Sequence, residues 1–93
     1  MSTNNKQEKI TLPGRLSRLV PSGYAVDDLP AAVERLAAYE DLHEWLLAEN
    51  ERLAEELSEM RAAGLDRTAR HRDLLGKKLQ IVYALSFFNA RGL

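Results

Sequence analysis

Helix-forming residues dominate two long stretches of the chain, which are separated by Gly64. The first stretch has no helix breaker after Pro30, and a proline in the first turn costs no helical hydrogen bond. Asp27 and Asp28 precede it and suit the positive end of the helix dipole. The pattern predicts a helix over residues 29–63.

The residues around Gly64 also predict how this helix ends. Glycine readily adopts the left-handed conformation that closes a helix at its C′ position. Leu65 then follows at C″, where it can contact Met60 in the last turn. We predict a Schellman cap at this point.

The second stretch, residues 66–90, is predicted to be a helix capped by Asp66 and ended near Gly92. Part of it also alternates as a strand does, with apolar side chains at Leu79, Ile81, Tyr83, Leu85 and Phe87. No turn residue separates this part from the preceding helix formers, and a lone strand would have no sheet to join. We predict a helix and keep a strand over residues 79–88 as the alternative.

The N-terminal part of the chain has a different character. Residues 1–12 are polar and unpatterned, and prolines and glycines interrupt the residues that follow. Short extended pieces and a single helical turn around Arg15–Leu19 both fit this part. We divide the chain into a flexible, irregular segment 1–26, a long acidic amphipathic helix 27–64 and a basic, then apolar, helix 65–93, with residues 27–93 as one domain.

A narrow apolar stripe on the long helix has the heptad spacing of a coiled coil. It consists of Leu46, Asn50, Leu53, Leu57 and Met60. An asparagine in such a stripe can pair with its counterpart in a second chain and fix the register of a dimer. We predict that the stripe is the seam of a homodimer, either a parallel coiled coil or a dimer of hairpins. The same stripe also fits an intramolecular bundle in which Asn50 contacts water.

The two helices have complementary sequences if the chain folds back at Gly64–Leu65. Residue 65 + k then lies level with residue 64 − k, which sets apolar residues 79–88 beside residues 41–50. Bases also meet acids, with Arg67–Arg72 near Glu55, Glu56 and Glu59, and with Lys77 and Lys78 near Glu49 and Glu51. We predict an all-α fold built on this αα-hairpin, with coiled-coil-like dimerisation.

The net charge of −1 conceals an uneven distribution. Residues 27–64 carry eleven acids and three bases, whereas bases outnumber acids on both sides of them. The long helix can therefore attract the rest of its own chain or a basic partner. The chain has no cysteine, which excludes disulfides and thiolate chemistry. It has no apolar run of about 18 residues and no signal peptide, so we expect a cytoplasmic protein without a membrane partner.

The bases of the C-terminal helix are the candidates for nucleic-acid binding: Arg67, Arg70, Arg72, Lys77 and Lys78. Such a cluster can bind phosphates. The hairpin places acids beside it, however, and no aromatic residues are interleaved with it for stacking on single strands. We therefore favour a protein partner over nucleic acid.

Aromatic and acidic side chains are the candidates for binding that partner. Phe87 and Phe88 cannot both point inward from one helix, so we expect one of them to be exposed. The full set of candidates is Trp45, Phe87, Phe88, Glu49, Glu55, Glu56 and Glu59.

No motif for catalysis or for a cofactor is found. The chain has no phosphate loop, no nucleophile beside a base, and no spaced pair of metal ligands. Its two histidines, His43 and His71, stand far apart, and a lone histidine on a helix face is usually packed in the core. We predict no catalytic, cofactor or metal site.

Two segments, Arg15–Val26 (RLSRLVPSGYAV) and Glu34–Asp41 (ERLAAYED), carry a resemblance. This pair resembles small accessory proteins of phages and prophages of Gram-positive bacteria. The resemblance brings no catalytic residues, and it implies a gene of a mobile element acting in the cytoplasm of the host. Inhibitors of host defence and small regulators belong to this class.

These observations predict a non-enzymatic helical module that binds a host protein. As a phage accessory protein it would act as an inhibitor or regulator, including an inhibitor of the anti-CRISPR type. The alternative is a small DNA- or RNA-binding regulator that uses the patch at Arg67–Arg72.

Overall fold

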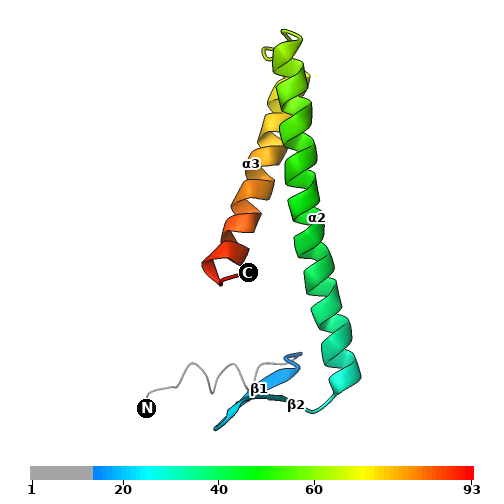
Figure 1. The fold of residues 1–93 in the computed structure, drawn as a ribbon, viewed down its shortest axis with the longest axis vertical. Helices are drawn as coiled ribbons and strands as arrows, with labels where there is room; N and C mark the ends of the chain where they lie inside the picture. The colour runs from blue at the N-terminus through cyan, green and yellow to red at the C-terminus, as the bar shows by residue number, and fades with distance from the viewer. Residues whose placement is uncertain (1–13) are drawn as a thin grey trace. The chain divides into compact units, whose positions relative to one another are not determined.

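A computed structural model of the chain describes residues 14–93 and is mostly helical (Figure 1). Its elements are β1 (Ser17–Val20), β2 (Gly23–Val26), α2 (Leu29–Ala62) and α3 (Ala69–Ala90). The chain divides into two compact units, the first ending at Tyr39 and the second beginning at Glu40, inside α2. The predicted tail, residues 1–12, lies outside the described residues.

The segment predicted to be irregular contains a small antiparallel sheet. Its register runs from the pair Ser17–Val26 to the pair Val20–Gly23, and the intervening loop has only two residues. Gly23 adopts φ 136°, a conformation that few other residues adopt. The all-α prediction is corrected to a mostly helical fold with one two-stranded sheet. The sequence did not predict the sheet because strands of four residues are too short to show a clear periodic pattern.

α2 begins and ends as predicted to within one residue. Asp28 caps its start, since the Asp28 Oδ1 accepts a hydrogen bond from the Ala31 N–H at 3.1 Å. Its end is a Schellman cap: Gly64 has φ 75°, its N–H bonds the Arg61 carbonyl at 3.1 Å, and the Leu65 N–H bonds the Met60 carbonyl at 2.8 Å. The predicted cap is confirmed.

α3 starts later than predicted, and its cap is Thr68 rather than Asp66. The Thr68 Oγ1 accepts a hydrogen bond from the His71 N–H at 3.2 Å and donates one to the Leu65 carbonyl at 2.7 Å. Asp66 lies in the turn before the helix, so its carboxylate is too early in the chain to cap it. Residues 79–88 are helical throughout, which settles the alternative of a strand.

The second unit has a small core between α2 and α3. Leu53 and Leu57 of α2 are almost wholly buried and cluster with Leu74 of α3, and Met60 and Ile81 pack against them. Farther along the helices, the ring of Phe88 stacks on that of His43, with centroids 4.5 Å apart. α3 thus runs back beside α2, as in an αα-hairpin (Figure 1).

Among the described residues, no helix combines the length and the apolar character that crossing a membrane requires.

Candidate functional site

A chain of ion pairs links the acids of α2 to the bases of both helices. Arg52 bonds Glu49 at 2.9 Å and Glu56 at 3.1 Å, and Arg70 of α3 bonds the other oxygen of Glu56 at 3.0 Å. The hydrogen bond from Arg52 lowers the pKa of Glu49, and the nearby charge of Lys77 adds to this effect. Glu49 and Glu56, both predicted to bind a partner, are therefore engaged within the chain.

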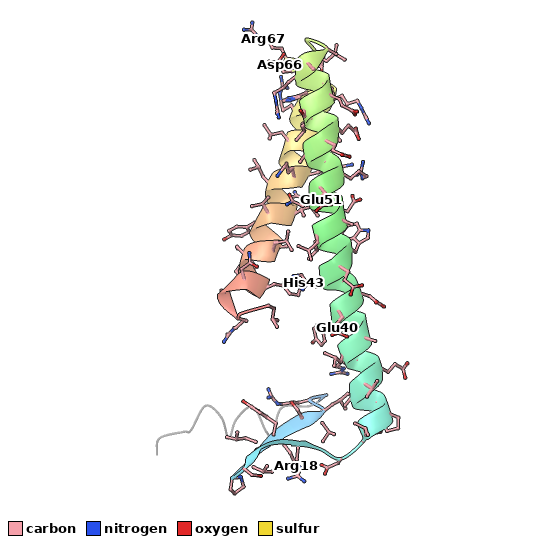
Figure 2. All side chains as sticks on the ribbon, in the orientation of Figure 1. Arg18, Glu40, His43, Glu51, Asp66 and Arg67 are labelled. Carbon is pink, nitrogen blue, oxygen red and sulfur yellow. The ribbon has the colours of Figure 1, made fainter. Side chains whose placement is uncertain are left out.

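A second set of acids on α2 is free of such pairs. Glu51, Glu55 and Glu59 are exposed, and within residues 14–93 none of them forms an ion pair. Spacing of four residues places them one above another on a single side of the helix. We call these three residues the acidic row; Figure 2 labels Glu51 on α2.

Large apolar side chains are also exposed on α2 ahead of this row, with Trp45 six residues before Glu51. Trp45 is 55% exposed, and Leu42, one helical turn before it, is about half exposed. A tryptophan accessible to this degree on a charged helix is typical of residues that anchor protein contacts. Trp45 and the acidic row form the candidate site on α2.

The two adjacent phenylalanines of α3 have different surroundings. Phe88 is half-buried and stacks on His43, with an angle of 9° between the ring planes. Phe87 is largely exposed and meets the edge of Tyr83 instead. One of the pair therefore faces the hairpin and the other faces outward, as the helical geometry requires.

The stripe predicted to be a dimer seam contacts α3 within the single chain. Leu46, Leu53 and Leu57 are buried, and Met60 packs against the same cluster. Asn50 accepts a hydrogen bond from the Lys78 Nζ at 3.0 Å. These side chains can serve a seam between two α2 helices only if α3 moves away, and the seam stays a prediction.

Contacts with α2 engage part of the candidate nucleic-acid patch and leave the rest exposed. Arg70 pairs with Glu56, and Lys78 bonds Asn50, so two of the five bases are held by α2. Arg67 and Arg72 are exposed, and no ion pair of either is found within residues 14–93. Figure 2 shows Arg67 beside Asp66 at the turn between the helices. The patch available to an outside ligand is thus smaller than the sequence suggests.

The histidines take part in packing. His71 of α3 is 92% buried, and its Nε2 has no hydrogen-bond partner among the described residues. His43 stacks on Phe88, as described above. In the described part of the chain, no group of three acidic or histidine side chains is arranged to hold a metal ion.

One feature of the first unit has no counterpart in the sequence predictions. An open cavity of about 510 Å³ lies between the sheet and the start of α2. Arg35 donates a hydrogen bond to the Gly14 carbonyl at its edge. Its lining is Gly14, Arg15, Leu16, Ser17, Val26, Ala32, Arg35, Leu36 and Tyr39. The apolar residues that α2 contributes to this lining, Ala32, Leu36 and Tyr39, could not be singled out in the sequence, because their spacing is that of any amphipathic helix.

A scan of protein-family models and searches of curated proteins and of solved structures each found no significant match to this chain.

Proposed function

We propose that this chain is a non-enzymatic helical module that binds another protein through Trp45 and the acidic row of α2. In line with the resemblance stated above, the partner is a host protein, and the module acts on it as a phage-encoded inhibitor or regulator, for example of the anti-CRISPR type. The partner presents an apolar pocket for the indole and basic side chains for the row.

The observation that carries this proposal is the acidic row itself. Like charges four residues apart destabilise a helix by about 0.2–0.5 kcal/mol per pair. Arg52, the base closest along the helix, is bonded to Glu49 and Glu56 instead. A surface that lowers the stability of its own helix is typical of a binding role, in which a basic partner removes the repulsion.

Trp45 supplies the apolar part of the same surface. Tryptophan is enriched among the few residues that contribute most to protein interfaces, where its truncation typically costs about 2 kcal/mol or more. An exposed indole on an otherwise acidic helix gains this energy only when a partner covers it. We therefore assign Trp45 as the anchor and the acidic row as the element that orients the partner.

Affinity capture from a nuclease-treated lysate of a Gram-positive host tests the proposal. We expect a defined protein to be retained by the wild-type chain and by Val33→Ala, which truncates a similarly exposed apolar side chain twelve residues before Trp45 on α2. Trp45→Ala should lose it, and added salt should weaken its retention.

The change of Glu51, Glu55 and Glu59 to glutamine separates binding from folding. It should keep or raise the melting temperature, because the repulsion is removed, and should weaken capture. Capture unaffected by both this variant and Trp45→Ala would refute the proposed surface.

The nucleic-acid alternative has its own test. A gel-shift titration with duplex DNA and RNA at two salt concentrations should show no specific complex if the proposal is right. A complex that weakens steeply with salt and is lost when Arg67 and Arg72 become glutamine would favour the alternative.

A further inference from the structure

The second half of α3 is a helix without charge. Residues 79–90 contain no acidic or basic side chain over three helical turns. Ile81, Leu85 and Phe88 use one side of it to contact the rest of the hairpin. Its only polar side chains are Gln80, Ser86 and Asn89, and large apolar side chains remain exposed on the side away from the hairpin. An apolar helix face is normally covered.

The open side carries a regular row of large side chains. Leu79, Tyr83 and Phe87 follow one another at intervals of four residues, and all three are exposed, Tyr83 to 69%. The rings of Tyr83 and Phe87 meet edge to face, with centroids 5.2 Å apart. The surface along this row is shallow, open and almost wholly apolar, and Leu79, Gln80, Val82, Tyr83 and Ser86 form it. We call Leu79, Tyr83 and Phe87 the α3 outer stripe.

We propose that the α3 outer stripe is the interface between two copies of this chain, packed antiparallel about a two-fold axis at Tyr83. This proposal concerns a different helix from the site of the proposed function and does not depend on it.

The order of side chains along the stripe favours a second copy as the occupant. Tyr83 lies at its centre, with a large apolar residue four positions before it and another four positions after it. An antiparallel pair brings Leu79 level with Phe87 of the second copy and Tyr83 level with itself. The stripe is thus complementary to itself, which a two-fold interface requires.

The charges at the ends of the stripe agree with this arrangement. The bases nearest to it are Lys77, Lys78 and Arg91, which come level with Asn89, Phe88 and Leu75 of the second copy, and these three residues are uncharged. Lys78 is in addition held by Asn50 within its own hairpin. No like charges therefore oppose each other across the interface. A partner with a charged surface would have to bury its charges against the three uncharged turns of α3, and removing those charges from water would cost free energy.

The mass of the full chain in solution tests the proposal. Light scattering over a series of micromolar and higher concentrations should give twice the 10.5 kDa of one chain. Tyr83→Arg should halve this mass, because it sets two like charges on the axis. Tyr24→Arg makes the same change at a tyrosine of the sheet that is equally exposed, at 67%, and should leave the dimer intact.

The orientation has a separate test. Leu79→Lys and Phe87→Glu should each weaken the dimer, and the chain that carries both should regain it, because an antiparallel pair sets each lysine level with a glutamate. In a parallel pair, like charges would meet and the double variant would stay monomeric. That result would overturn the antiparallel arrangement.

Chemical cross-linking covers the case in which Tyr83→Arg fails to fold. Because the chain has no cysteine, Tyr83→Cys introduces a single thiol close to the axis. Mild oxidation should yield a covalent dimer of this variant and not of Tyr24→Cys. A wild-type mass of one chain throughout the series, or a dimer unaffected by the changes at Tyr83, would overturn the proposal.

Discussion

Lys78 of α3 donates a hydrogen bond from its Nζ to the Oδ1 of Asn50 of α2, at 3.0 Å. This contact joins residues 28 positions apart and fixes the level of one helix against the other. It also gives Asn50 a partner within the single chain, where a dimer seam would pair it with a second asparagine.

A double-mutant cycle measures this contact. Asn50→Ala and Lys78→Met should show a coupling of about 1 kcal/mol in the free energy of unfolding, because each removes one side of the same hydrogen bond. Urea unfolding of the wild type, both single variants and the double variant supplies the numbers. Lys77→Met, at the neighbouring base, should show no coupling to Asn50→Ala. Equal coupling to both lysines would mean that the register is different.

The buried His71 should lower the stability of the hairpin. Its Nε2 is buried without a hydrogen-bond partner among the described residues, and such a group costs about 1–3 kcal/mol. We expect His71→Leu to raise the melting temperature, by about 4–8 °C per kcal/mol gained in a chain of this size. The backbone N–H of residue 71 keeps its bond to Thr68 in this variant. A lower melting temperature would show that the imidazole makes a specific contact.

The start of α3 should depend on Thr68 and not on Asp66. Thr68→Ala removes the side-chain oxygen that accepts the His71 N–H, and loss of such a cap typically costs about 1 kcal/mol. Asp66→Ala, two residues earlier, should change the melting temperature little. Thermal unfolding followed by circular dichroism checks both. The reverse order of effects would restore the cap that the sequence predicted.

The ion pair of the first unit makes a prediction about pH. Arg18 forms two hydrogen bonds with Asp27, each 3.0 Å long, and together with its charge they lower the pKa of the Asp27 carboxyl. A carboxyl whose pKa is lower in the folded state adds stability above its unfolded pKa. This contribution is lost as the pH falls through the folded value.

An NMR titration of the Asp27 carboxyl measures this shift. We expect Arg18→Gln to raise the pKa of Asp27 toward its ordinary value. Arg15→Gln is the matched control, since Arg15 bonds the Ser17 carbonyl instead, and it should leave the pKa of Asp27 as it is. An unchanged pKa in Arg18→Gln would mean that the pair does not form in solution.

Local signals predicted the helices and their approximate register. Gly64 ends α2 because the C′ position of the cap requires a left-handed backbone conformation. Glycine is the residue that adopts this conformation most readily, so the end of the helix could be predicted from the sequence. The alignment of bases with acids placed Lys78 level with Glu51, one residue from its observed partner Asn50. Phe88 was placed level with Asp41, two residues from His43.

Other features depend on contacts that no local pattern encodes. Of the two alternatives for the N-terminal part of the chain, the short extended pieces were right and the helical turn around Arg15–Leu19 was wrong. The pairing of Ser17–Val20 with Gly23–Val26 was not predicted, because strands this short show no period and their pairing depends on the two-residue loop. The cap of α3 was predicted at the wrong residue. Asp66 lies in a turn that precedes the helix, and Thr68 is the residue directly before its first turn. The stripe on α2 was ambiguous, since a helix of the same chain and a helix of a second chain require the same apolar spacing.

The central claim is that α3 packs on α2 within one chain. Nuclear Overhauser contacts, recorded on a mixture of isotope-labelled and unlabelled chains, test it most directly because they separate contacts within a chain from contacts between chains. We predict intrachain contacts between the rings of His43 and Phe88 and between Leu53 and Leu74. Contacts of Leu53 and Leu57 with the same residues of a second chain, without these intrachain ones, would contradict the hairpin and establish a seam between two α2 helices.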